Sequence, residues 1–134
     1  FSIIMLDIDH FKKLNDQYGH YVGDVVLQQF ANTIRKNLRE EDLFARIGGE
    51  EFVILLRNIQ ADEAQKIAER IRNIVETTPI QIDQNNELYI TVSIGITHET
   101  LPDAPSLQFL INQADQALYQ AKQLGRNQVI LANC

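Results

Sequence analysis

The sequence predicts a single domain of the α+β class, in which helices pack on one face of a largely antiparallel sheet. Three observations lead to this expectation. The length of 134 residues suits one compact domain. Apolar runs of strand length are interspersed with segments of helical periodicity. One strand run alternates apolar and polar residues, which favours an antiparallel or mixed sheet.

The N-terminal third predicts a strand and two helices. Residues 1–8 are an apolar run too short for a helix, so they predict a central strand that ends in acidic residues. Asp9 is interpreted as the cap of a short helix that closes at Gly19. In residues 21–38 an apolar residue recurs at every fourth position, which predicts an amphipathic helix.

The middle of the chain predicts a β-hairpin. Residues 43–47 and 52–56 have strand character, and Gly48, Gly49 and two glutamates separate them. Adjacent glycines tolerate positive φ, which a tight hairpin turn needs.

The C-terminal half predicts two further helices and at least two strands. Asp62 is interpreted as a helix cap, and the alternation over residues 88–97 predicts a strand with one buried face. Ser106 is expected to open the last long helix and Gly125 to end it, before a closing strand over residues 128–131. The expected order is strand, helix, helix, strand, strand, helix, one or two strands, helix, strand.

Composition excludes several classes of protein. A formal net charge of -6 argues against a sequence-independent grip on nucleic acid. The one cysteine, Cys134, excludes a disulfide scaffold and is interpreted as an exposed thiol without function. The longest apolar run, residues 52–56, is far shorter than the ~20 residues that span a bilayer. Because the chain opens at Phe1 inside an apolar run, we expect it to be a fragment of a longer protein.

Two acidic pairs suggest a metal site. Asp7 and Asp9 end the first strand, and Glu50 and Glu51 follow the glycines of the hairpin. If that strand lies beside the hairpin, the two pairs meet at one edge, where hard oxygen ligands would suit Mg²⁺ and the chemistry of nucleotidyl transfer. The alternative is structural: Asp7 only ends a strand, Asp9 only caps a helix, and the glutamates only solubilise a turn. For Asp9 we prefer the cap.

The turn Gly48-Gly49-Glu50-Glu51-Phe52 is one of several short motifs that follow one another along nearly the whole chain. The others are Asp7 to Asp16, Gly19-His20, Gly23-Asp24, Arg46, Ala121-Lys122 and Gly125-Arg126-Asn127. On these residues the chain resembles the GGDEF-domain diguanylate cyclases, which accept Glu at the third position of the turn. The resemblance implies that residues 1–134 form one GGDEF domain with a ferredoxin-like, palm-like fold, related to nucleotide cyclases and polymerase palms.

The resemblance also implies an activity. Two GTP molecules would condense to cyclic di-GMP, a bacterial second messenger, with release of two pyrophosphates. The reaction would need Mg²⁺ or Mn²⁺ and a symmetric homodimer, because each 3′-hydroxyl attacks the α-phosphate held by the other domain. A regulatory sensor domain and a cytoplasmic location, alone or as the cytoplasmic part of a membrane-anchored protein, are expected with it.

Site residues follow from the resemblance position by position. Asp7 and Glu50 look like metal ligands, assisted by the carbonyl of Ile8, and Glu51 resembles the residue that orients or deprotonates the 3′-hydroxyl. The expected substrate contacts are, for the phosphates, His10, Phe11, Lys12, Lys122 and Arg126, and for guanine, Asn15 and Asp24. A carboxylate at position 24 accepts from N1–H and N2–H of guanine, which adenine lacks, so it favours GTP over ATP.

Purely structural interpretations also fit some of these residues. Lys12 and Lys122 would also suit solvated helix surfaces, and Asn15 would suit a helix end. His20 and His98 are interpreted as structural or exposed, since their spacing does not suggest a zinc site.

A second site is expected upstream of the turn. Arg39-Glu40-Glu41-Asp42 resembles the R-x-x-D inhibitory site of the family, in which Arg39 would bind guanine or phosphate and Asp42 the base edge. Arg70 lies where some members place another product contact. The resemblance therefore implies product inhibition. The alternative is that these residues are only a mixed-charge helix end and a solvated arginine.

Two rival functions remain. One is a catalytically silent module that senses GTP or cyclic di-GMP, and the other is a ferredoxin-like interaction domain without a ligand. The intact turn favours catalysis over the silent module. The interaction domain would leave the coincidence of acids, cations and guanine contacts unexplained.

Overall fold

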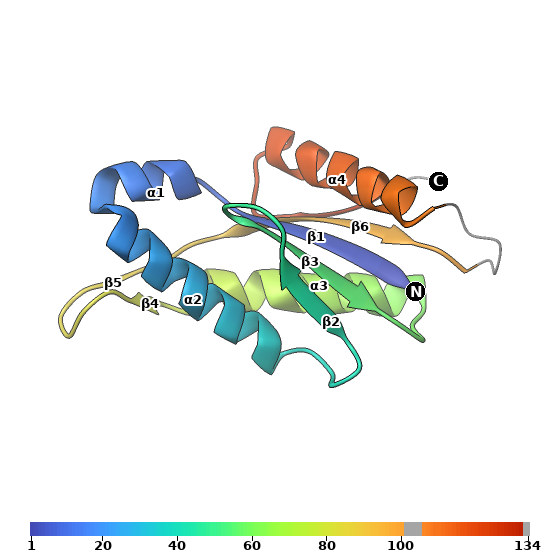
Figure 1. Ribbon diagram of the computed structural model, residues 1–134, viewed down its shortest axis with the longest axis horizontal. Coiled ribbons are helices and arrows are strands. Elements are labelled where there is room, and N and C mark those ends of the chain that lie inside the picture. The colour runs from blue at the N-terminus through green and yellow to red at the C-terminus, as the bar shows by residue number, and fades with distance from the viewer. Residues whose placement is uncertain (101–105, 133–134) are drawn as a thin grey trace.

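The computed structural model of the protein describes residues 1–100 and 106–132. Its centre is a five-stranded sheet in the order β2-β3-β1-β6-β7 (Figure 1). All neighbouring strands are antiparallel except β6 and β7, which are parallel. The strands are β1 (Ser2–Ile8), β2 (Leu43–Arg46), β3 (Glu51–Leu56), β6 (Val92–His98) and β7 (Val129–Leu131). The predicted α+β class and its mostly antiparallel sheet are confirmed.

Four helices and a small hairpin complete the described structure. The helices are α1 (Phe11–Tyr18), α2 (His20–Lys36), α3 (Ala61–Thr77) and α4 (Leu107–Gln123). A separate two-stranded sheet, β4 (Ile80–Gln81) with β5 (Glu87–Leu88), projects near α1. The single strand expected over residues 88–97 is therefore divided, because Leu88 ends β5 and β6 begins at Val92.

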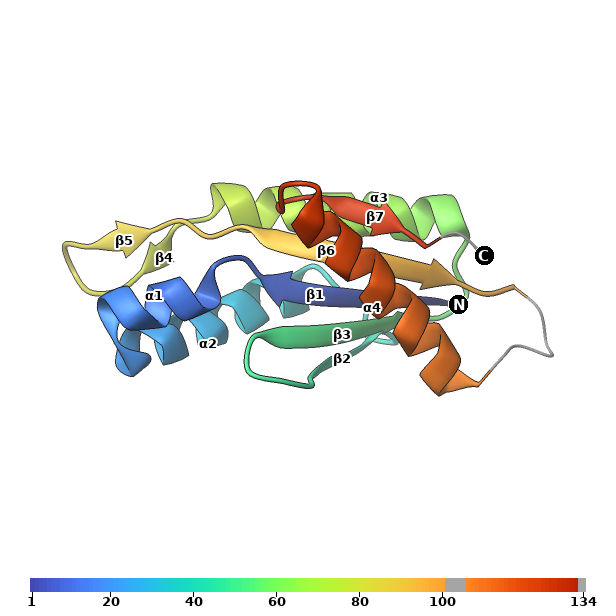
Figure 2. The ribbon, with the colours of Figure 1, turned by 90° about the horizontal axis from the view of Figure 1, so that it is seen from above.

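Strand β1 is buried on both faces, as expected of a central strand. Ile4, Leu6 and Ile8 join the core that α2 and α3 cover. Ile3 and Met5 point to the other side, where they pack against α4. The expectation that the helices share one face was wrong: α4 crosses the face opposite to α2 and α3 (Figure 2). Because β1 carries apolar side chains on both of its faces, its sequence does not reveal which face of the sheet each helix covers.

Strand β6 was expected to have one buried face, and this was also wrong. Every residue from Val92 to Thr97 is buried. The polar alternates Ser93 and Thr97, together with Gly95, are small residues that lie beneath α4 rather than in solvent. A Cβ at Gly95 would lie 2.2 Å from the carbonyl oxygen of Ala114 in α4. The pattern of small residues therefore marks a close approach of helix to sheet.

Two of the three predicted helix caps differ from the structure. The N-cap of α1 is His10, which makes no side-chain cap hydrogen bond, so Asp9 is not the cap. The N-cap of α3 is Gln60, also without a side-chain bond, and Asp62 lies in the first turn. Ser106 caps α4 as predicted, because its side chain accepts a hydrogen bond from the backbone N–H of Phe109.

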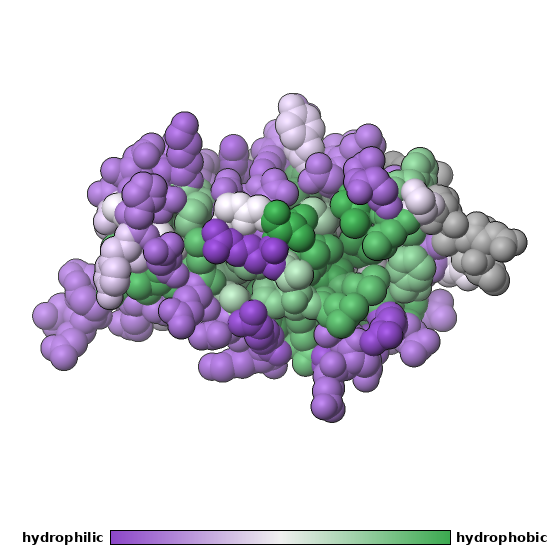
Figure 3. All heavy atoms as spheres, in the orientation of Figure 1, coloured by the Kyte–Doolittle hydropathy of each residue, from purple (hydrophilic) through white to green (hydrophobic). Residues whose placement is uncertain are grey.

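An apolar groove lies on the surface between α4 and the β2–β3 hairpin. It encloses about 380 Å³ and is lined by residues that include Leu43, Val53 and Leu107. In Figure 3 the apolar colour gathers over this region, between polar surfaces. No helix in the described part of the chain is long and apolar enough to cross a membrane. Cys134 lies outside the described residues.

The close approach at Gly95 gives a test of the packing. Gly95→Ala would force its Cβ against the α4 backbone, at 2.2 Å from Ala114 O and 2.3 Å from Leu118 N. Because main-chain atoms cannot rotate away, we expect the free energy of unfolding to fall by about 1–3 kcal/mol or more in urea denaturation. The same substitution at Gly49, where a Cβ meets nothing within 4 Å, is the control and should cost far less. Equal stability of the two variants would contradict this packing.

Candidate active site

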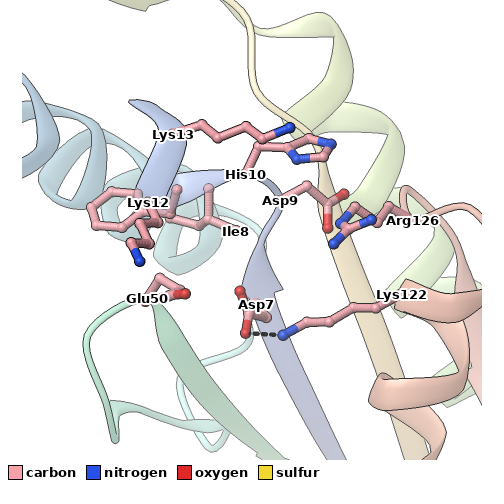
Figure 4. Close-up of a pocket in the computed structure, with 10 residues that line it drawn as sticks. Asp7, Ile8, Asp9, His10, Lys12, Lys13, Glu50, Lys122 and Arg126 are labelled. Atoms are coloured by element: carbon pink, nitrogen blue, oxygen red, sulfur yellow. Dashed lines mark hydrogen bonds and ion pairs between the residues drawn. The ribbon is translucent and has the colours of Figure 1, made fainter. Parts of the chain in front are cut away.

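The acidic end of β1 and the tip of the β2–β3 hairpin lie side by side. Asp7 is the antiparallel partner of Glu51, and the backbone N–H of Ile8 donates to the carbonyl of Glu50 at 3.3 Å. The two acidic pairs therefore meet at one edge of the sheet, as the sequence predicts. Asp7 and Glu50 both line a cavity of about 270 Å³, and Figure 4 shows their carboxylates on neighbouring walls of it.

Asp7 is an almost fully buried carboxylate, with 3% of its surface exposed. Burial raises its pKa from 3.8 to about 6. The ammonium of Lys122 in α4 opposes this shift through a hydrogen bond and its charge, at 2.5 Å from Asp7 Oδ2. The negative charges of Glu50 and Glu51 raise the pKa further. Within residues 1–100 and 106–132, the ion pair found for Asp7 is the one with Lys122, so three carboxylates gather around this paired cation.

The donor set suits a hard divalent cation that is also bound by a substrate. Among the described residues there is no group of three or more His, Cys, Asp or Glu side chains placed to hold a metal. Asp7 and Glu50, with the backbone carbonyl of Ile8, offer fewer ligands than a closed protein cage. Mg²⁺ is commonly held by one or two carboxylates, with waters and phosphates completing its shell. The residues therefore fit Mg²⁺ or Mn²⁺.

The hairpin tip is held by Arg46 rather than by unusual glycine conformations. The Arg46 Nε donates to the carbonyls of Gly48 and Gly49 at 3.0 and 3.1 Å, and Nη2 donates to Gly49 at 2.8 Å. Neither glycine has positive φ, contrary to the expectation for this turn. A Cβ at Gly49 would meet nothing within 4 Å, so packing does not require glycine there. The bare backbone instead leaves room for a ligand beside Glu50.

A second cavity of about 390 Å³ adjoins the first, because Phe11, Lys12 and Glu50 line both. Asn15 and Asp24, from α1 and α2, also line it. The Oδ1 of Asn15 is buried without a hydrogen-bond partner. The side chain of Asn15 occupies the place of an absent Cβ at Gly23, which would lie 1.8 Å from Oδ1. Gly23 is thus needed to admit Asn15 at this position.

His20, predicted to be structural or exposed, lines the same cavity as Asn15 and Asp24. Its side chain is exposed at the start of α2, four residues before Asp24. Residues four apart on a helix share a face, so the spacing of His20 and Asp24 was a signal that could have placed them together.

The remaining predicted phosphate contacts line the first cavity. His10, Phe11, Lys12, Lys122 and Arg126 all contribute to its wall. Phe11 is 6% exposed and packs into the core, so only its backbone can face a ligand. His10 and Arg126 have left-handed backbones, with φ of 58° and 67°. Such conformations cost about 1–3 kcal/mol and persist only where the surroundings hold them.

Arg39 and Asp42 form a tight pair on the loop before β2, at the opposite end of this strand from the hairpin tip. Arg39 Nη2 and Nε donate to Asp42 Oδ1 at 2.8 and 3.1 Å, and the Arg39 backbone N–H donates to Oδ2 at 2.7 Å. This hydrogen bonding raises the pKa of Arg39. Arg70 donates from α3 to the carbonyl of Asn37 on the same loop, at 3.1 Å. The three predicted residues are therefore neighbours, away from the acidic cavity.

Comparison with known proteins agrees with this arrangement. The family described as "Diguanylate cyclase, GGDEF domain" matches residues 1–128. The chain belongs to this family. Diguanylate cyclase A of Treponema denticola is 45% identical over 131 residues, which are 98% of this chain and 35% of that protein. The chain thus spans about a third of the length of the curated relatives it matches first.

Solved GGDEF domains have the same fold. The GGDEF domain of DgcB from Caulobacter crescentus, in complex with c-di-GMP, has a TM-score of 0.89 at 36% identity, over 97% of this chain and 76% of that one. The active GGEEF domain of a diguanylate cyclase from Vibrio cholerae has a TM-score of 0.88 at 35% identity, over 99% and 83%. The GGEEF motif of that domain is the same as residues 48–52 here.

The raised pKa of Asp7 gives the GGDEF domain a defined pH dependence of stability. Between pH 3.8 and about 6 the folded protein holds a proton on Asp7 that the unfolded chain has lost. Protonation of the buried Asp7 carboxyl therefore stabilises the folded protein fully below pH 3.8, and this stabilisation is lost as the pH rises through about 6. Asp7→Asn lacks this titration. We expect its free energy of unfolding, relative to wild type, to rise by at most ~3 kcal/mol from pH 4 to 7.

Urea denaturation of both proteins at each pH, without divalent cations, measures this difference. A difference between Asp7→Asn and wild type that stays constant across the range would contradict the raised pKa.

Proposed function

We propose that this GGDEF domain is a diguanylate cyclase that condenses two GTP molecules into cyclic di-GMP with release of two pyrophosphates. The observation that carries the proposal is the shared cavity of Asp7 and Glu50, which come from separate elements. Lys12 lines this cavity and also the adjoining one, which Asn15 and Asp24 line as well. Acids, cations and guanine-binding groups thus follow one another along a path that suits a nucleoside triphosphate.

Asp7 and Glu50, with the carbonyl of Ile8, would hold Mg²⁺ or Mn²⁺. When bound, the cation supplies Lewis acidity, which lowers the pKa of an attacking hydroxyl and stabilises a leaving oxygen on phosphorus. The burial of Asp7 supports this role, because a desolvated carboxylate gains more from a cation than an exposed one.

The phosphates would lie against Lys12, Lys122 and Arg126, three of the Lys and Arg side chains on the wall of the first cavity. Lys122 contacts Asp7 and is 31% exposed, so its flexible side chain can also reach into the cavity. The backbone around His10 and Phe11 would approach the same phosphates. This arrangement neutralises the charge of the pyrophosphate that leaves.

The guanine base would occupy the second cavity. The carboxylate of Asp24 can accept from N1–H and N2–H of the base, and the Asn15 amide and His20 imidazole offer further hydrogen-bonding groups. The unpaired Oδ1 of Asn15 supports a polar ligand there. Adenine lacks the N1–H and N2–H donors, so the pocket would favour GTP.

Catalysis would require a homodimer. One domain offers one set of acids and one nucleotide path, so a symmetric partner would present the second GTP. Glu51 is the cross-strand partner of Asp7, and their side chains lie on the same face of the sheet. Glu51 would therefore orient or deprotonate the incoming 3′-hydroxyl. Two-fold symmetry makes the two attacks equivalent.

A second role is product inhibition at Arg39, Asp42 and Arg70, with a regulatory sensor domain elsewhere in the full-length protein as the source of the input signal. The guanidinium and carboxylate of the pair are mostly satisfied by each other, so cyclic di-GMP would have to replace bonds already formed. A catalytically silent sensor would use the same cluster. The intact acids Glu50 and Glu51 favour the cyclase.

Turnover of GTP tests the cyclase directly. Full-length protein incubated with GTP and Mg²⁺ should form cyclic di-GMP, measured by chromatography. Asp7→Ala and Glu50→Ala should each lower kcat by at least about 100-fold, because loss of one carboxylate removes a ligand of the cation that stabilises the charge of the transition state. Glu63→Ala, an exposed carboxylate in α3, is the control and should retain full activity. Undiminished turnover in either acidic variant would remove the metal assignment.

Product inhibition has a separate test. Arg39→Ala should raise the inhibition constant of cyclic di-GMP at least about tenfold, because a charge-assisted hydrogen bond is lost, while kcat stays within about twofold. Steady-state kinetics with added cyclic di-GMP measures both. Lys66→Ala, which removes an exposed cation from α3, is the control. An unchanged inhibition constant in Arg39→Ala would reject this site.

A further inference from the structure

Asp9 is a buried carboxylate that does not cap α1 and has no role in the proposed chemistry. It follows β1 directly and is 6% exposed. None of the ion pairs found within residues 1–100 and 106–132 includes it. A buried carboxylate without a cation is unfavourable unless hydrogen bonds satisfy it.

Neutral donors from two distant parts of the chain satisfy both oxygens of Asp9. Ser93 Oγ donates to Oδ1 at 2.6 Å, and Thr91 Oγ1 donates to Oδ2 at 2.7 Å. The backbone N–H of Asn127 also donates to Oδ2, at 3.0 Å. Thr91 directly precedes β6 and Ser93 lies near its start, whereas Asn127 lies in the turn between α4 and β7. With its oxygens committed, Asp9 is poorly placed to act as a metal ligand beside Asp7.

The turn that Asp9 holds has an unusual backbone. Arg126 and Asn127 adopt left-handed conformations in succession, with φ of 67° and 47°. Non-glycine residues keep such conformations only where contacts hold them. The Asn127 side chain accepts from Arg72 Nη1 at 2.9 Å and donates to Glu76, both in α3. Asp9 holds the main chain of the same residue from the other side.

The hydrogen bonds of Asp9 and of the Asn127 side chain fix the backbone position from which Arg126 enters the first cavity. Arg126 lines that cavity with Asp7 and Lys122, and in the view of Figure 4 its guanidinium lies on the same side of the cavity as Asp9, across from Glu50. A long exposed side chain loses less entropy on binding when its backbone is already fixed. The charge of Asp9 would itself repel a phosphate, so any benefit to binding must come through geometry.

We propose that Asp9 is a positioning residue for Arg126: it ties the left-handed turn at Arg126 and Asn127 to β1 and β6, so that the guanidinium meets the phosphate chain of the substrate. The inference rests on the proposed function, in which Arg126 contacts phosphate. It assigns Asp9 neither to the metal nor to the cap of α1.

Calorimetry with two guanine ligands tests this role. The ligands are the non-cleavable guanosine 5′-(α,β-methylene)triphosphate and GMP, which lacks the distal phosphates, each in the presence of Mg²⁺. Asp9→Ala should weaken the triphosphate at least about tenfold, since one charge-assisted contact is lost, and change GMP by less than about twofold. Arg126→Ala should do the same. The double variant should bind no more weakly than Arg126→Ala alone, because the two residues act as one unit.

Asp9→Asn is the matched control. Its amide oxygen can still accept from the Asn127 N–H, while its NH₂ group donates to the Ser93 hydroxyl, which can rotate to accept. We therefore expect both ligands to bind within about threefold of wild type. If Asp9→Ala fails to fold in a thermal melt, Asp9→Ser replaces it, since its shorter hydroxyl falls about one bond short of Asn127.

Other outcomes overturn the inference. Unchanged triphosphate binding in Asp9→Ala, equal losses for GMP, or losses that multiply in the double variant would each exclude positioning through Arg126. Tighter triphosphate binding in both Asp9→Ala and Asp9→Asn would mean that Asp9 acts only through its charge. Wild-type protein that binds neither ligand would instead refute the proposed function, and this inference with it.

Discussion

Burial of β1 on both faces is the constraint on which the rest of the structure depends. A strand covered by α2 and α3 on one side and by α4 on the other cannot slip in register, because a slip by one residue would move every side chain to the wrong face. Its register fixes Asp7 opposite Glu51 and Ile8 beside Glu50. The acidic edge is therefore placed by packing, not by attraction among the acids, whose charges repel.

The cost of that placement is visible at Asp7 and is reduced by α4. Burial and neighbouring glutamates disfavour the charged carboxylate, whereas Lys122 stabilises it. The same helix approaches the sheet closely at Gly95, and its C-terminal end leads into the turn of Arg126. This helix thus carries Lys122 and leads into the turn of Arg126, two of the Lys and Arg side chains that line the first cavity. The fold and the electrostatics of the site are set by the same contact.

Local patterns in the sequence predicted much of this. The apolar run of β1, the hairpin and the Ser106 cap depend on neighbouring residues, and each is present. The meeting of Asp7 with the glutamates could also be predicted, since it needs only one strand beside one hairpin. The resemblance to the GGDEF family supplied the remaining expected contacts of the site.

The errors arose where distant residues decide the structure. The partners of Asp9 lie 82 to 118 residues away, so a cap looked equally suitable from the sequence. Polar alternation in β6 suggested a solvated face because small residues beneath a helix give the same pattern as residues in water. Similarly, periodicity predicted α4 but did not assign it to a face of the sheet.

The central claim is that carboxylates from β1 and from the hairpin share a divalent cation with a guanosine triphosphate. The most direct measurement is a crystal structure with Mn²⁺ and guanosine 5′-(α,β-methylene)triphosphate, in which the anomalous signal locates the metal. The account predicts Mn²⁺ within bonding distance, about 2.0–2.3 Å, of carboxylate oxygens of both Asp7 and Glu50, with phosphate oxygens in the same shell. Mn²⁺ bound to the nucleotide without either carboxylate would contradict it.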